Sequence, residues 1–255
     1  MLSFFQNPDV QEQLSILWNN LPSDIWATLY STILATVFSY VIGLPLGILL
    51  VTGEADGVRP LPAPLMKVIN FIINILRSVP FLILMVLVTP LSRLVLGTSI
   101  GTAATIIPLV VAAFPFVARL VEGSIREVDK GVIEAAQAMG CSPLQVIGKV
   151  LLPESRPSLI TGFTTAFITI LSYGAMAGAI GGGGLGSMAL MLGYQRRMYI
   201  VLYVSVVVLV ILVQIFQSAG THLAVRMDKR LTKGGQARRG IKQKIKDDKH
   251  IPGSM

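Results

Sequence analysis

The chain has 255 residues, of which 53% are hydrophobic and 13% charged, and its net charge at pH 7 is +8. Soluble domains carry about 25% charged residues, so this composition excludes a soluble domain or an enzyme of the aqueous phase and predicts an integral membrane protein. The single cysteine, Cys141, excludes a disulfide framework within the chain. The histidines, His222 and His250, do not have the spacing of a zinc site, so we expect no bound metal.

Residues 1–24 precede the first apolar stretch and contain three acidic residues but no Lys or Arg. A cleaved secretory signal needs a positive N-terminal region and a shorter apolar core. These residues are therefore predicted to form an extracytoplasmic leader, which is a short amphipathic or irregular segment outside the membrane.

Five apolar stretches are long enough to cross a hydrocarbon core, which takes about 20 helical residues. They cover residues 25–51, 68–91, 98–120, 159–180 and 198–219. The sequence therefore predicts an all-α integral membrane protein with about five transmembrane helices, and a membrane domain that covers residues 25–225.

Arg77 is the one charged residue well inside a predicted span, and Ser78 and Pro80 interrupt the same stretch. A charge at the bilayer centre costs about 2.5–3.5 kcal/mol on insertion scales, so Arg77 is expected to face the protein interior or an interface. It contacts either a transported substrate or a gate carbonyl, or it makes a structural contact before a kink at Pro80. We favour the structural interpretation.

The distribution of positive charge predicts the orientation, because Lys and Arg beside the spans remain on the cytoplasmic side. The loops after the first and third spans and the tail hold 17 of the 21 Lys and Arg residues. Only Arg93, Arg196 and Arg197 lie on the opposite side. We expect the N-terminus outside and the C-terminus in the cytoplasm, although the Arg196–Arg197 pair argues against it.

The loop between the third and fourth spans, residues 121–157, is predicted to contain two short helices. Good helix formers fill residues 132–139, and Gly140 is the residue type expected just past a helix end. Ser142 is predicted to cap a second helix with Pro143 in its first turn, and that helix is expected to stop near Pro153.

Leu144, Ile147 and Leu151 have helical spacing, which predicts one apolar face on the second helix. A short amphipathic helix below the membrane suits a groove on a soluble partner. The alternative is a solvated loop that only joins two spans.

Gly174, Gly178, Gly182 and Gly186 recur every four residues, which predicts a glycine face on one helix. Such a face allows close helix packing in lipid, and it could also form a wall of a transport pathway. The run from Gly181 to Gly184 lacks the pattern of a phosphate-binding loop, so we expect no nucleotide site in this chain.

The tail, residues 226–255, contains ten basic and three acidic residues and no aromatic residue. Nucleic-acid binding is one interpretation of such a run. We favour a disordered cytoplasmic tail held near anionic lipid headgroups, with no nucleic-acid partner.

The loop of residues 121–157 resembles the EAA loop of permease subunits in bacterial ABC importers. The resemblance holds at each signature position, namely Glu134, Ala135, Ala136, Gly140, Val150, Leu152 and Pro153. It implies a type I ABC importer permease fold in which this loop is a cytoplasmic coupling helix that docks into a cleft of a separate ATPase subunit. ATP would be bound by that partner, so this chain would be neither an enzyme nor a cofactor protein.

Residues 75–81, 98–104, 114–122, 172–186 and 193–194 resemble the methionine-importer branch of these permeases. The resemblance implies import of L- or D-methionine across the bacterial inner membrane. It also implies a homodimer of this chain with two ATPase subunits and an extracytoplasmic methionine-binding protein. An importer for another amino acid or small solute remains an alternative.

Two other classes fit the sequence less well. A self-sufficient secondary transporter usually needs carboxylates inside the membrane or inverted repeats, and the predicted spans contain no Asp or Glu. A membrane enzyme needs paired acids, metal ligands or a nucleophile with a base, and no such set lies near a span end.

Tyr173 and Met176, in the fourth span, are candidates for substrate contact together with Arg77. The resemblance implies that this part of the span lines the central cavity, and the polarizable side chain of methionine adapts to an apolar thioether ligand. Packing against lipid or a neighbouring helix is the alternative for Met176.

Overall fold

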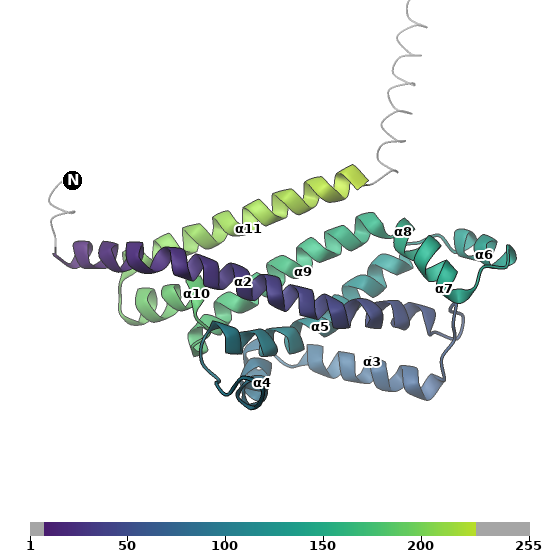
Figure 1. Cartoon of the computed structure of the whole chain (residues 1–255), viewed down its shortest axis with the longest axis horizontal. Helices are drawn as coiled ribbons and strands as arrows, with labels where there is room; N and C mark the ends of the chain where they lie inside the picture. Colours follow the sequence, from purple (N-terminus) through teal and green to yellow (C-terminus); the bar gives the residue numbers. More distant parts are fainter. Residues whose placement is uncertain (1–7, 228–255) are drawn as a thin grey trace, which may run out of the picture.

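The computed structural model describes residues 8–227, and within this range every regular element is a helix (Figure 1). The first seven residues of the predicted leader lie outside the described range, and so does the tail from residue 228 onward, including His250. The all-α prediction is confirmed.

Four helices are long and apolar enough to span a membrane, and they run roughly side by side in Figure 1. They are α2 (Pro8–Thr52), α5 (Thr102–Arg126), α9 (Arg156–Ala177) and α11 (Tyr199–Met227). A fifth span exists only if α3 (Ala63–Ser78) and α4 (Phe81–Leu96) count together, because the two helices meet at an angle of 110°.

Residues 68–91, predicted as one span interrupted at Pro80, form two helices with a bend at that proline, and by length and composition the pair fits one broken span or a re-entrant segment. Val79, which joins the two helices, has extended backbone angles of φ −78° and ψ 128°. The ring of Pro80 disfavours a helical conformation in the residue before it. The chain therefore turns sharply at this point.

Helix α2 begins at Pro8 and has no break near residue 24, so the described part of the predicted leader is helical and continuous with the first span. Polar residues lower the hydropathy of this segment, but its apolar side chains still pack. Leu17 is buried in a cluster with Leu185 and Val201 from the C-terminal part of the chain. The backbone N–H of Ile200 also donates to Gln13 Oε1 at 3.1 Å. Residues 8–24 are thus part of the packed helical body.

Helices α2 and α5 form the centre of the molecule because two glycines allow their backbones to approach closely. A Cβ atom at Gly43 would lie 2.8 Å from Val117 Cγ1, and one at Gly47 would lie 2.6 Å from the carbonyl oxygen of Ala118. Contacts this short do not occur for real Cβ atoms, so glycine is required at both positions. Val117 and Ala118 are fully buried.

A tight turn of glycines follows α9 where the sequence predicted a continuous glycine face. Helix α9 passes into the short 3₁₀ helix η2 (Gly178–Ile180), and the chain then reverses with positive φ at Gly181, Gly183 and Gly184. Only glycine adopts these angles without strain. The prediction of one helix face was therefore wrong, because four-residue spacing does not keep residues aligned across a chain reversal.

The close packing that the glycines predicted is nevertheless present, in a different form. Gly178 lies directly against Gly186 and Ser187, because the turn folds α10 (Gly184–Ser187) back onto the end of α9. The turn is held from two sides. The N–H of Gly101 donates to the carbonyl of Gly181 at 2.9 Å, and the N–H of Leu185 donates to Thr28 Oγ1 at 2.9 Å.

The π-helix η3 (Met188–Gln195) continues α10, so an additional helical segment that was not predicted lies between the fourth and fifth spans. Gly193 lies against the backbone of Leu202, which joins this segment closely to α11.

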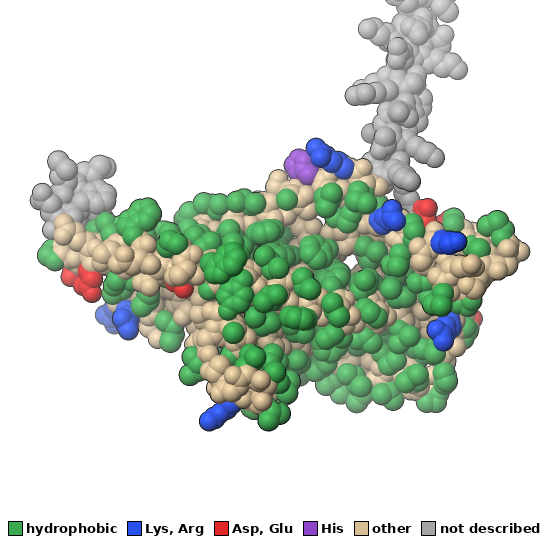
Figure 2. All heavy atoms as spheres, in the orientation of Figure 1, with side chains coloured by type: hydrophobic (Ala, Val, Ile, Leu, Met, Phe, Trp, Pro, Cys, Tyr) green, Lys and Arg blue, Asp and Glu red, His purple; other side chains and the backbone are tan. Residues whose placement is uncertain are grey.

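Hydrophobic side chains cover the middle of the face shown in Figure 2, while its charged side chains lie toward the ends and the lower edge. The largest exposed apolar side chains include Leu87 and Leu94 of α4 and Tyr203 of α11. Such a surface is stable only against lipid or another protein.

We predict that Gly186→Ala destabilises the protein by about 1–3 kcal/mol, because the new methyl group would overlap the backbone of Ala175. Gly174→Ala is the matched control, since no atom lies within 4 Å of a Cβ built there. Thermal unfolding in detergent measures both. A Gly186→Ala protein that melts at the temperature of the Gly174→Ala protein would contradict the packing described.

Candidate functional site

The segment 121–157 begins with the end of α5, and the first short helix predicted for the loop follows as α6 (Lys130–Ala138). The carboxylate of Asp129 caps its first turn by accepting from the N–H of Gly131 at 2.7 Å. At the other end Gly140 has φ +80°, and the N–H of Cys141 donates to the carbonyl of Ala136. This is a Schellman motif, which fixes the direction in which the chain leaves α6.

The second helix of the loop starts as predicted but does not end at Pro153. Ser142 precedes α7 (Pro143–Val146), and Gln145 Oε1 accepts from the N–H of Ser142 at 2.9 Å. Helical backbone then continues through η1 (Ile147–Leu151) and α8 (Leu152–Glu154).

A π-type turn allows the helix to pass Pro153. The N–H of Leu152 donates to the carbonyl of Ile147, five residues earlier. The wider turn changes the hydrogen-bond pattern just before Pro153, which has no N–H to donate. The helix direction changes only at Ser155, whose ψ is 0°, and α9 follows directly.

The π-type turn also changes which face of this helix is buried. Val146 and Leu151, five residues apart, are buried against Val121 and Ile125 of α5. Leu144 is 70% exposed, so the predicted apolar face of Leu144, Ile147 and Leu151 was wrong. The loop is therefore packed onto the end of α5 and is not a flexible connection.

The signature residues of the loop divide into exposed and packed positions. Glu134, Ala135 and Gly140 are exposed, while Ala136 is buried. The remaining three are half-buried, namely Val150, Leu152 and Pro153. Met139 and Leu144 add two large exposed apolar side chains near the turn between the two helices, at 77% and 70% exposure. The loop thus presents a rigid surface with an acidic group and an apolar tip.

A cavity of about 520 Å³ lies between α6 and the connection from α2 to α3. Glu134 and Gln137 line it from α6, and Glu54 and Asp56 line it from the connection. The exposed face of α6 therefore adjoins a second surface, which carries both carboxylates and apolar side chains.

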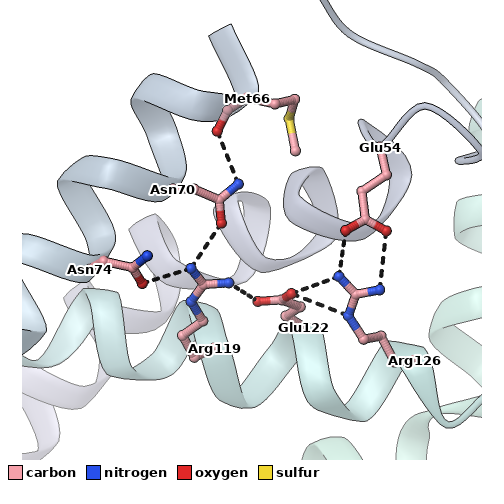
Figure 3. Close-up of polar contacts among 7 residues, drawn as sticks. All are labelled: Glu54, Met66, Asn70, Asn74, Arg119, Glu122 and Arg126. Atoms are coloured by element: carbon pink, nitrogen blue, oxygen red, sulfur yellow. Dashed lines mark hydrogen bonds and ion pairs between the residues drawn. The ribbon is translucent and has the colours of Figure 1, made fainter. Parts of the chain in front are cut away.

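A cluster of charged side chains on α5 connects this region to the membrane helices (Figure 3). Glu122, with 11% of its side chain exposed, lies between two arginines of its own helix. Arg119 Nη1 contacts Glu122 Oε2 at 2.6 Å, and Arg126 Nη2 contacts Glu122 Oε1 at 2.8 Å. The carboxylate is therefore paired on both sides, as a nearly buried charge requires.

Each arginine also reaches a different neighbouring segment. Arg119 Nη2 donates to Asn70 Oδ1 at 2.8 Å and to Asn74 Oδ1 at 2.9 Å, which links α5 to α3. Arg126 makes two hydrogen bonds to the Glu54 carboxylate, at 3.1 and 2.6 Å, which link α5 to the connection after α2. The hydrogen bonds from Arg126 hold the pKa of the Glu54 carboxyl below its usual range, so this link is intact at neutral pH.

The sequence did not predict this cluster. Arg119 and Arg126 served as indicators of orientation, residues 114–122 contributed to the family resemblance, and Glu122 was placed in the loop. The spacing of Arg119, Glu122 and Arg126 at three and four residues was the available signal, because such residues lie on one helix face. The partners Asn70, Asn74 and Glu54 gave no sequence signal.

Two of the three residues predicted to contact substrate line the same cavity. Arg77 and Tyr173 both face a space of about 160 Å³ at the junction of α3 and α4. The ring of Tyr173 stacks on that of Phe81, with the ring centroids 4.1 Å apart and the planes at 11°. Arg77 is exposed and has no ion-pair partner among residues 8–227.

Met176 lies elsewhere. It lines a separate cavity of about 460 Å³ between α9, α10 and α11, together with Ala189 and Val210. The structure therefore does not bring Met176 to the space that Arg77 and Tyr173 share.

In the part of the chain that the structure describes, no three His, Cys, Asp or Glu side chains are grouped closely enough to hold a metal ion. Cys141 is half-buried.

Residues 43–233 match the family of binding-protein-dependent transport system inner membrane components. The chain belongs to this family of inner-membrane permeases, as the loop and the helical arrangement indicated.

Several relatives match over most of the chain. The probable D-methionine transport system permease protein of Vibrio cholerae is 46% identical over 218 residues, which cover 84% of this chain and 96% of that protein. The methionine import system permease protein of Bacillus subtilis is 46% identical over 164 residues, covering 64% of this chain and 74% of that protein.

A solved structure gives the same result for the fold. The inward-facing methionine ABC transporter MetNI contains a chain with a TM-score of 0.81 and 41% identity, covering 84% of this chain and 98% of that chain. An amino acid ABC transporter matches with a TM-score of 0.68 at 20% identity, which shows a shared fold alone. The prediction of a type I ABC importer permease fold is confirmed.

We predict that Glu122→Gln lowers the free energy of unfolding by about 2–3 kcal/mol. This is less than the cost of breaking a fully buried ion pair, because Arg126 is half exposed. The neutral side chain leaves two neighbouring arginines without their shared carboxylate. Glu54→Gln is the control, since both side chains of its ion pair are about half exposed and its loss costs at most about 1 kcal/mol. Equal melting temperatures for the two variants would contradict the central role of Glu122.

Proposed function

We propose that this chain is the permease subunit of an ATP-driven importer that carries methionine, in its L or D form, across the bacterial inner membrane. The relatives named as methionine permeases, which are 40–46% identical over most of the chain, carry this proposal. An importer for another amino acid or small solute is the alternative, because the structure fixes no ligand.

The proposal assigns ATP hydrolysis to a separate subunit. ATP would bind to that partner, and this chain would need no cofactor of its own. The exposed surface of α6 and α7, with Glu134 and the apolar side chains of Met139 and Leu144, would dock into the partner. The rigid packing of Val146 and Leu151 on α5 supports this role, because movement of the docked surface would move α5 with it.

The complete transporter would contain two copies of this chain, two ATPase subunits and an extracytoplasmic methionine-binding protein, surrounded by membrane lipids. The loop would face the cytoplasm with the C-terminus, and the N-terminus would lie outside. The numerous Lys and Arg residues around the loop support this orientation.

Arg77 and Tyr173 are the residues that we place in the substrate pathway, because they share a cavity beside the bend between α3 and α4. A guanidinium group there could attract the carboxylate of an amino acid. Met176 remains a weaker candidate, since its cavity is separate.

We predict that Glu134→Lys weakens binding of the ATPase subunit at least tenfold, because reversing an exposed charge in the docking surface leaves a desolvated like-charge contact. Tagged protein purified in detergent from its native host would retain the ATPase in stoichiometric amount, and the variant would not. Glu12→Lys is the matched control, because Glu12 is also exposed but lies near the other end of α2. A well-folded native chain that retains no ATPase would instead favour a self-sufficient transporter.

We predict that Arg77→Gln and Tyr173→Ala each reduce methionine uptake at least fivefold without changing assembly with the ATPase. Uptake of labelled methionine into proteoliposomes that contain the complete transporter measures this effect. Met176→Ala, which lies on the same helix as Tyr173, serves as the comparison. Normal uptake by an assembled Arg77→Gln transporter would leave Arg77 with a structural role only.

A further inference from the structure

An apolar groove of about 340 Å³ lies between α2, α9 and α11, away from the loop and from the cavity of Arg77. Large apolar side chains from all three helices line it, including Ile33, Val37, Ile160, Phe163 and Leu223. None of the functions assigned above uses this groove.

The polar residues of the groove offer no free hydrogen-bond donor to a ligand. Thr164 Oγ1 donates to the carbonyl of Ile160 at 2.9 Å, and Thr36 Oγ1 donates to the carbonyl of Thr32 at 2.7 Å. Both hydroxyls thus bond within their own helices, as threonine does in apolar surroundings. Among residues 8–227 no charged side chain lines the groove, so an amino acid zwitterion would lose its hydration there without an ion pair to compensate.

Aromatic rings close one end of the groove. Phe167 and Phe216 contact each other across α9 and α11, with ring centroids 4.4 Å apart, and Phe167 is only 6% exposed. Phe163, one turn closer to the loop, is 44% exposed at the rim. The space therefore runs along the helices from this closed end toward the loop side of the molecule.

Two arginines flank the opposite end. Arg156 precedes Ile160 by four residues on α9, and Arg226 follows Leu223 by three residues on α11, so each lies about 5–6 Å beyond the groove along its helix. Both are exposed, and neither has a hydrogen bond or ion pair to the rest of residues 8–227. In Figure 2, Lys and Arg side chains appear at this end, where α11 and α8 end.

The distance from the flanking arginines to the closed end of the groove matches one leaflet of a bilayer. Phe167 lies eleven residues beyond Arg156, which is about 16 Å along a helix. Half of a hydrocarbon core is about 15 Å. A positive rim followed by an apolar groove that ends at this depth is complementary to a negatively charged headgroup with an attached acyl chain.

We infer that this groove binds one acyl chain of an anionic phospholipid, whose headgroup phosphate is held by Arg156 and Arg226. The proposed orientation places this lipid in the cytoplasmic leaflet. The inference rests on the proposed function only for that choice of leaflet. The lipid would be a bound component of the permease, fixing α11 relative to α9 where their ends meet the headgroups.

Native mass spectrometry of the detergent-purified transporter tests the inference. The protein is given equimolar phosphatidylglycerol and phosphatidylcholine. Both lipids have the same pair of acyl chains, and in each lipid one of the two chains carries a photoactivatable diazirine. The expected result is a several-fold preference for bound phosphatidylglycerol, with cross-links in residues 160–167 and 216–223.

Two variants separate the chain site from the headgroup site. Ala219→Phe fills the groove from an exposed position and should abolish the retained lipid and its cross-links. Arg156→Gln combined with Arg226→Gln should remove the preference for phosphatidylglycerol while the groove cross-links remain. Val207→Phe is the matched control, because Val207 is 55% exposed on α11 but does not line the groove, and it should change neither result.

Two outcomes would overturn the inference. Equal retention of both lipids, unchanged by Ala219→Phe, would mean that only ordinary surrounding lipid contacts this face. An intermolecular disulfide formed by Ala219→Cys would mean that a second copy of the chain covers the groove. Neither result depends on methionine or on the ATPase, so failure of this inference is distinguishable from failure of the proposed function.

Discussion

Backbone hydrogen bonding away from water is the constraint on which the rest of this structure depends, because every N–H and C=O inside a bilayer needs a partner from the protein. Regular helices meet the constraint, and the interesting features are the places where helices end. At the turn after α9, the backbone groups of Gly101 and Gly181 bond to each other, and Thr28 accepts from Leu185. These hydrogen bonds connect α2, α5 and α9, so the contacts that satisfy the backbone at the turn also hold the bundle together.

The charged cluster on α5 pairs a nearly buried carboxylate near the loop. Glu122 would be costly as a lone charge, but between Arg119 and Arg126 it becomes the shared member of a network that reaches α3 and the connection after α2. The same end of α5 buries Val146 and Leu151 of the loop. A partner docked on the loop would therefore contact a surface that is continuous, through α5, with the helices beside Arg77.

The sequence predicted features that depend on neighbouring residues, and it failed where distant segments decide. Hydropathy located the apolar spans, and glycine and serine marked the ends of the loop helices, because these are local effects. The extension of α2 to Pro8 depends on packing against α10 and α11, which no window of residues 1–24 contains. The π-type turn before Pro153 shifted the buried face from Leu144 to Val146, because periodicity assumes a regular helix. The further partners of Arg119 and Arg126 come from segments 45 to 72 residues away.

The single helix from Pro8 to Thr52 has a mechanical consequence. Its 45 residues correspond to a rod of about 68 Å, roughly twice the thickness of the hydrocarbon core. One end packs against α11 through Leu17, and the other ends two residues before Glu54, which Arg126 holds. Pro22 and Pro45 lie within this helix, and each lacks the N–H of a helical hydrogen bond, so the rod is continuous but has two points at which it can bend. The two ends of the helical bundle are thus connected by one continuous helix, and its prolines are the points at which one end can move relative to the other.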